Sequence, residues 1–372
     1  MTPRSSSLLH KTSAWPLALV YLGLLVYASL YPFSDWRDQG IMPYTFLWQP
    51  LPKYWTGFDV AINVLGYAPF GFLLALSALR TGRSRHALLV AALSAALLAF
   101  WMETLQSYLP SRVASNVDFF LNALGGWMGA ALAVLLERVG ALARWSRIRE
   151  RWFVADARGG LVLLCLWPVA LLFPAAVPLG LGQVLERLEA TVAGLLQDTP
   201  FLSWLPVREV ELQPLIPAAE LICVLLGALI PCLLSFCIVR SAPRRALFAL
   251  GVIATGIAAT ALSWALSYGP AHAWGWFGLP AQAGLGTALF VALVLVPLPH
   301  RVCAALVLLG VGMYLAVLNQ APASAYFAQT LQTWEQGRFI RFNGVAQWLG
   351  WLWPFGTLAY VLALVWGRGT RN

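Results

Sequence analysis

Residues 214–239 read PLIPAAELICVLLGALIPCLLSFCIV, and Glu220 is the only charged residue in the stretch. The hydrocarbon core of a bilayer is about 30 Å thick, so a spanning helix needs roughly 20 mostly apolar residues. The stretch meets that length without interruption. It therefore predicts a membrane-spanning helix and sets the class of the whole protein.

The composition of the 372 residues extends this prediction to the rest of the chain. Hydrophobic residues make up 60% and charged residues 10%, against about 45–50% and about 25% in soluble domains. We therefore expect an all-α, polytopic membrane bundle. The apolar blocks predict ten spanning helices, at approximately 14–32, 58–79, 87–106, 117–136, 159–178, 214–239, 246–267, 281–298, 302–318 and 345–366.

The net charge of +9 comes from Lys and Arg in short loops between apolar runs. Basic residues concentrated in alternate loops set membrane orientation, so we expect both termini inside and no nucleic-acid partner. The first span follows Arg4 and Lys11, and no A-x-A site follows it, so it is predicted to be a retained signal anchor. The predicted location is the bacterial cytoplasmic membrane, crossed many times, with membrane lipids as partners.

Amphipathic segments and loop lengths suggest how the chain divides. Arginines alternate with apolar residues between Glu137 and Arg158, which predicts a basic interfacial helix on the inner leaflet. A second amphipathic helix is predicted after Val184, in the long outer loop 180–213. We expect a four-helix module at 1–137, a linker at 138–158 and a second bundle of about six helices at 159–372.

Two predicted spans open with the same polar pattern. Thr56 to Gly66 reads TGFDVAINVLG and Ser115 to Gly125 reads SNVDFFLNALG, so both fit [S/T]-x-x-D-x-x-x-N-x-x-G. The Asp and Asn are four residues apart and share one helix face. The glycine lies on the same face, and we expect the Gly66 and Gly125 faces to pack together.

The third span adds polar groups at the same end of the bundle. Glu103 and Gln106 lie one turn apart near its end, and Arg112 follows in a short loop. Ionisable residues in membrane spans are functional candidates by default. The predicted outer-facing, substrate-binding pocket is lined by Asp59, Asn63, Glu103, Gln106, Arg112, Asp118 and Asn122.

A structural interpretation of these residues stays open. Ser or Thr three residues before Asp is a capping box, in which Asp59 and Asp118 only satisfy helix amides. Asn63 and Asn122 could equally serve as hydrogen-bonding residues between helices. Neither role explains Glu103 and Gln106 on the third span.

At these residues the sequence resembles the VanZ-like family, over roughly residues 15–136. The matching pattern is Asp59, Asn63, Pro69, Gly71, Glu103, Gln106, Arg112, Asp118, Asn122, Gly126 and Gly129. The resemblance implies a compact helical membrane module. The family is named for a protein associated with resistance to teicoplanin, which implies a role in the cell envelope.

The second half of the chain repeats part of the spacing of the polar pattern. The tenth span opens with Asn343, Gln347 and Gly350 at the same spacing, and the sixth opens with Glu220 and Gly227. In each, a proline follows the glycine by four residues. A duplicated module and chance in Gly-rich helices both explain this pattern.

The leading functional hypothesis is a pocket that handles a lipid-linked precursor or glycan headgroup, with Arg112 meeting a phosphate or carboxylate. The alternatives are an enzyme with Asp59, Glu103 and Asp118 as candidate acid–base residues, or a proton-coupled transporter or flippase. No cofactor is implied. Three acids and one base leave a negative surplus, so the site must be wet, bind a cation such as a divalent metal, or hold a carboxyl neutral. The scattered Cys and His residues predict no zinc site.

Overall fold

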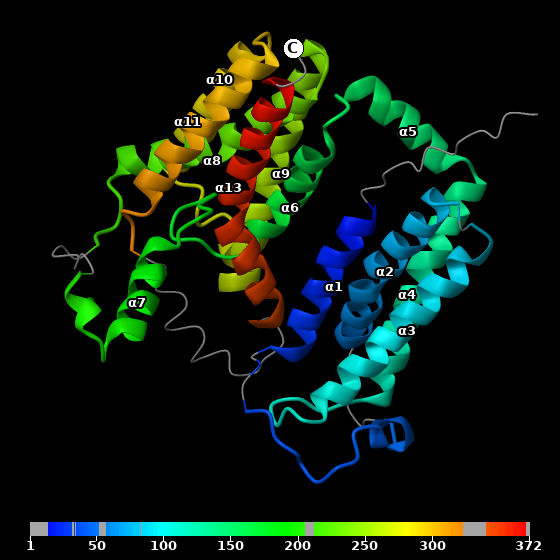
Figure 1. The fold of residues 1–372 in the computed structure, drawn as a ribbon. Helices are drawn as coiled ribbons and strands as arrows, with labels where there is room; N and C mark the ends of the chain where they lie inside the picture. Colours follow the sequence, from blue (N-terminus) through cyan, green and yellow to red (C-terminus); the bar gives the residue numbers. More distant parts are fainter. Residues whose placement is uncertain are drawn as a thin grey trace, which may run out of the picture. The chain divides into compact units, whose positions relative to one another are not determined.

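The computed structural model describes residues 14–31, 33, 35–51, 57–82, 84–204, 212–322 and 340–369 (Figure 1). This part of the chain folds into α-helices joined by loops and short 3-10 turns, and it forms no strand. The α-helices are α1 (Ala14–Leu30), α2 (Gly57–Arg80), α3 (Ala87–Gln106), α4 (Asn116–Arg138), α5 (Ala141–Trp152), α6 (Arg158–Ala170), α7 (Leu185–Leu196), α8 (Pro217–Ile238), α9 (Ala242–Tyr268), α10 (Leu279–Leu295), α11 (His300–Leu318) and α13 (Ile340–Gly369).

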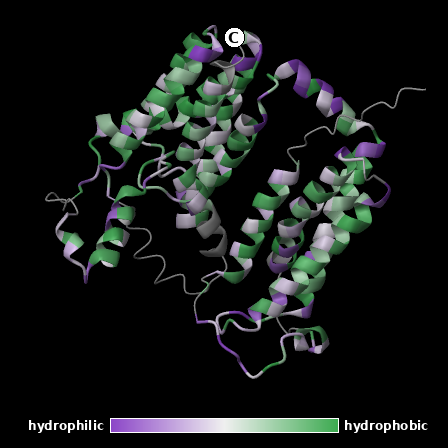
Figure 2. Ribbon diagram, in the orientation of Figure 1, coloured by the Kyte–Doolittle hydropathy of each residue, from purple (hydrophilic) through white to green (hydrophobic). Residues whose placement is uncertain are grey.

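The helical membrane class predicted from the sequence is confirmed. Among the described residues, seven helices are long and apolar enough to cross a membrane: α2, α3, α4, α8, α9, α11 and α13. Three shorter apolar helices, α1, α6 and α10, occupy the other predicted positions. Figure 2 shows hydrophobic residues along these helices and hydrophilic ones on α5 and in the loop after α1.

The fifth predicted span is wrong in its second half. We expected a helix over 159–178, but α6 ends at Ala170 and has 13 residues, which reach only about 20 Å. Pro174 and Pro178 lie beyond that end, and proline cannot continue a helix. Residues 171–184 are non-helical, although most are buried or partly buried.

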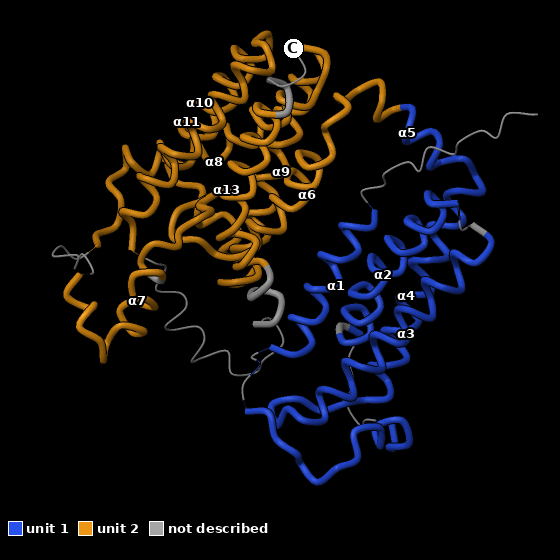
Figure 3. Tube along the Cα trace, in the orientation of Figure 1, with its two compact units in different colours: residues 1–147 blue, residues 148–372 orange. Residues whose placement is uncertain are grey.

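The chain divides into two compact units, Met1–Arg147 and Ile148–Asn372 (Figure 3). The division falls within α5, inside the segment that the sequence assigned to a linker. Helices are present in both predicted amphipathic segments, as α5 and α7. Several basic residues that contribute to the predicted membrane orientation lie outside the described residues: Arg4, Lys11, Lys53, Arg83, Arg208, Arg338 and Arg371. Thr56, which begins the first polar pattern, also lies outside them.

In unit 1 the helices α2 and α4 pack most extensively, with α3 against both. A Cβ atom on Gly125 would collide with the carbonyl oxygen of Val64, and one on Gly129 with that of Ala68. The two backbones therefore approach as closely as glycine allows. Gly66 was expected in this contact, but the space beside it is open. Val64 and Ala68, each two residues from Gly66 and so about 200° around the helix axis from it, face α4 instead. The Gly66 carbonyl accepts a hydrogen bond from Tyr21 Oη (2.8 Å).

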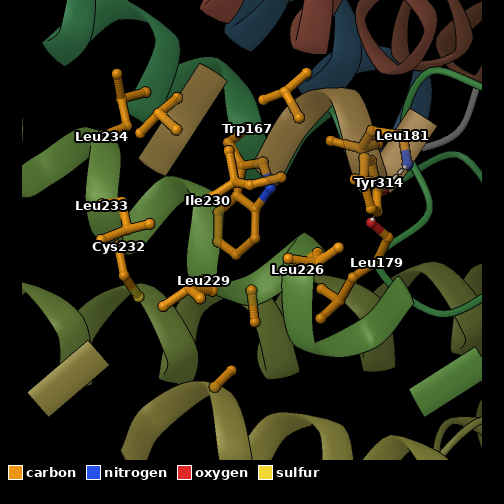
Figure 4. Close-up of a cluster of buried hydrophobic side chains, with 14 of the residues drawn as sticks. Trp167, Leu179, Leu181, Leu226, Leu229, Ile230, Cys232, Leu233, Leu234 and Tyr314 are labelled. Carbon is orange, nitrogen blue, oxygen red and sulfur yellow. Dashed lines mark hydrogen bonds between the residues drawn. The ribbon is translucent and has the colours of Figure 1, made fainter. Parts of the chain in front are cut away.

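Unit 2 is built around α8, which packs against α10 and α11 and also contacts α6 and α9. Nearly all of its residues from Cys223 to Ile238 are buried. The segment 214–239 that set the class of the protein thus contributes, from Cys223 onward, the centre of the larger core (Figure 4).

Candidate functional site

The three acids predicted for the pocket lie at one end of unit 1. Asp59 is in the first turn of α2, Glu103 in the last turn of α3 and Asp118 in the first turn of α4. The chain reverses direction between α2 and α3 and again between α3 and α4, which returns the acids to the same level.

The two D-x3-N helices meet through their polar residues. Asn63 Nδ2 of α2 donates to Asp118 Oδ1 of α4 at 2.7 Å. Asp59 is close enough to Asp118 for the two carboxylates to repel each other. Both acids therefore belong to one polar cluster, in which the Asn63 amide bonds to Asp118.

Glu103 connects α3 to the beginning of α4. It is 2% exposed, and its Oε2 accepts a hydrogen bond from the backbone N–H of Ser115 at 2.8 Å. Ser115 is the N-cap of α4, and its Oγ accepts from the N–H of Asp118 at 3.4 Å. In a capping box the acid of the same helix would take the N-cap N–H. Here Glu103 takes it, and the Asp118 carboxylate accepts from Asn63.

Gln106 and Arg112 face the C-terminal end of α1. Gln106 Nε2 donates to the carbonyl of Ser29 at 2.9 Å. The Arg112 guanidinium is buried and donates to the carbonyls of Ala28 and Tyr31. The last carbonyls of a helix lack partners within it, so these two side chains cap α1. The sequence suggested an anion for Arg112 and could not show this partner.

Asn122 lies one turn deeper than Asp118 and is 6% exposed. Its Oδ1 has no hydrogen-bond partner among the described residues. A buried amide oxygen without a partner costs about 1–3 kcal/mol. Asn122 is thus an acceptor that a ligand or a water molecule could satisfy.

Tyr67 is a site residue that the sequence reasoning missed. It is buried, and its hydroxyl lies near Glu103 and Ser29. The available signal was spacing: Asp59, Asn63 and Tyr67 recur every four residues on α2. A tyrosine in an apolar run is usually a core residue, so this spacing alone did not single it out.

The cluster is rich in acceptors. Its carboxylates and amides suit a ligand that donates hydrogen bonds, such as one carrying hydroxyl, amide or ammonium groups. The described residues contain no group of three or more His, Cys, Asp or Glu side chains close enough together to hold a metal ion.

Residues 15–137 match the family model described as VanZ/LLP1. No curated protein and no solved structure gives a significant match. The first unit therefore carries a VanZ-like membrane module, and the family match ends before α5.

Proposed function

From this VanZ-like module, we propose that unit 1 binds the headgroup of a cell-envelope component at the end that holds Asp59, Glu103 and Asp118. A lipid-linked precursor or a glycan is the ligand class. Hydroxyl and amine groups of the headgroup donate to the carboxylates, and Asn122 Oδ1 offers an acceptor one turn deeper. The predicted topology puts this end on the outer side of the membrane, where envelope precursors are used.

The contact between Asn63 and Asp118 is the observation that carries the proposal. A capping carboxylate would satisfy amides of its own helix, whereas Asp118 bonds across to α2 and lies within electrostatic range of Asp59. Placing two carboxylates together at a membrane boundary is unfavourable unless something offsets their repulsion. A donor-rich headgroup supplies that offset when it binds.

Complementation of a deletion strain tests the proposal, with a lipidomic comparison as the readout and membrane abundance measured in the same cells. Asp59→Asn, Asp118→Asn and Glu103→Gln keep shape and remove charge. We expect each to abolish complementation at near-normal abundance. Glu137→Gln is the matched control, because Glu137 is exposed at the opposite end of α4. Full complementation by all three site variants would reject a charged binding site.

The side of the membrane is tested separately by single-cysteine labelling on a cysteine-free background. Ser111→Cys, in the exposed loop after α3, should react with an impermeant reagent in intact cells. Arg147→Cys, in α5, should react only after the membrane is opened. The reverse pattern would place the site on the inner side and exclude an outer-leaflet headgroup as its ligand.

A further inference from the structure

The break after α6 places non-helical backbone inside unit 2. Leu171, Val177, Leu179 and Leu181 are each at most 5% exposed. Backbone polar groups within a membrane must be paired inside the protein, so irregular backbone is tolerated only where it is buried in protein or lines a cavity. Discontinuous helices of this kind build many membrane-embedded ligand sites.

Side chains of α11 and the residue after it hold the segment in place. The Tyr314 hydroxyl donates to the carbonyl of Leu179 (2.6 Å) and accepts from the N–H of Leu181 (Figure 4). The Asn319 amide donates to the carbonyl of Gly182 at 3.2 Å. Leu179 adopts a φ of 61°, an unfavourable value for a residue with a side chain. Such strain persists only where the surroundings impose it, and it clusters at functional sites.

The two G-x3-P helices singled out in the sequence meet at this segment. A Cβ on Gly227 of α8 would lie 2.9 Å from the Leu179 carbonyl oxygen, and one on Gly350 of α13 would lie 3.4 Å from that of Ala170. Proline has no N–H, so Pro231 cannot donate to the Gly227 carbonyl in the usual helical pattern. Pro354 leaves the Gly350 carbonyl in the same position. The break therefore gathers backbone acceptors that have lost their usual donors.

Unpaired polar side chains also occur on α6 and α9, near Gly256, whose neighbours include the Leu179 side chain. The Trp167 ring packs on Gly256, where a Cβ would be 2.7 Å from it, and Thr260 follows one turn along α9. Ser263, on the next turn, donates to the carbonyl of Leu172 at 3.0 Å. Trp167 Nε1 and Thr260 Oγ1 have no partner in the described part of the chain, although their residues are 2% and 4% exposed. Leaving them unpaired is costly, which indicates that something else satisfies them.

We propose that this break is a second binding site, and that it takes the uncharged hydroxyl group of a lipid alcohol. Trp167 Nε1 can only donate, Thr260 Oγ1 can donate or accept, and the carbonyls can only accept. A hydroxyl both donates and accepts, so it can satisfy both kinds of group.

The buried surroundings of the break favour an uncharged group. Among the described residues of unit 2, the buried charged side chain is that of Arg245. Its guanidinium bonds to the carbonyls of Val239, Val296 and Leu298, away from the break. An unpaired charge in such surroundings would be strongly unfavourable.

Thermal unfolding of the purified full chain in detergent tests the site. The probe is a diacylglycerol, and the control is its methyl ether, which lacks the free hydroxyl. A ligand that binds only the folded state raises the unfolding temperature in a saturable way. We expect this rise with the alcohol and not with the ether. Thr260→Val and Trp167→Phe should weaken the apparent affinity roughly three- to tenfold each, the factor for one neutral hydrogen bond. Thr104→Val, on α3 of unit 1, should leave it unchanged.

The unfolding temperature of each variant without ligand shows whether that variant folds normally. A loss of binding can therefore be told apart from a folding defect. Removing an unpaired buried hydroxyl does not destabilise a protein, so Thr260→Val should unfold at the same or a higher temperature than wild type. An equal rise with alcohol and ether, or a full response in both variants, would overturn the site. No rise with either lipid would also overturn it, and would assign the unpaired groups to buried water.

Discussion

The two units use polar groups in opposite ways. In unit 1 the polar side chains form hydrogen bonds between helices at one end of the unit. Further along, the glycines of α4 pack against the backbone of α2. In unit 2 the polar side chains of Tyr314 and Asn319 bond to the backbone of a broken helix within an apolar core. The difference shows which polar groups each unit has to pair: acidic side chains in the first, and buried non-helical peptide groups in the second.

One way to test this comparison is to block the close contact in unit 1. In Gly129→Ala the new Cβ would collide with the Ala68 carbonyl, so α2 and α4 must separate. Overpacking of this kind usually costs about 1–3 kcal/mol, and rigid backbone on one side favours the upper end or more. Gly66→Ala is the control, because space beside Gly66 is open. The measurement is thermal unfolding in detergent, and equal unfolding temperatures for the two variants would contradict the packing.

A second test of the comparison removes the Tyr314 hydroxyl from unit 2. Tyr314→Phe leaves the Leu179 carbonyl and the Leu181 N–H without their partner, at about 1–3 kcal/mol for each group. We expect a clear fall in unfolding temperature. Tyr360→Phe is the control, since its hydroxyl bonds to the Asp156 carbonyl at an exposed position. If both variants behave alike, Tyr314 does not hold the segment.

Features of the sequence that depend on spacing along one helix were predictable. The positions of the helices and the shared end of Asp59, Glu103 and Asp118 follow from apolar length and from the alternating direction of the chain. The early end of α6 was foreseeable in principle from Pro174 and Pro178, but the apolar run masked it.

Contacts between helices were not predictable, because they depend on rotation about each helix axis. Val64 lies in the α2–α4 contact, and Gly66, about 200° around the helix axis from it, does not. The same limit applies to Arg112, whose sequence position in a loop says nothing of the α1 carbonyls that it meets. Spacing identifies which residues share a face, and only the packed structure shows what that face meets.

The smallest expected effect on stability concerns Arg112, and it separates a cap from a ligand contact. Arg112 Nη2 donates to the carbonyls of Ala28 and Tyr31. A lysine ammonium can reach one such carbonyl and keeps the charge favoured at a helix C-terminus, which is worth about 0.3–1 kcal/mol. If Arg112 only caps α1, Arg112→Lys should lower the unfolding temperature slightly and complement the deletion strain fully.

If Arg112 also meets a phosphate or carboxylate of the headgroup, the same variant should fold nearly normally and fail to complement. Lysine offers a point charge without the planar fork that binds such anions through two hydrogen bonds. Arg112→Met, which removes the charge and keeps much of the apolar stem, is the companion variant. Full complementation by Arg112→Lys together with failure of Arg112→Met would show that positive charge suffices. Full complementation by both would remove Arg112 from the binding site and leave the acids to recognise the headgroup alone.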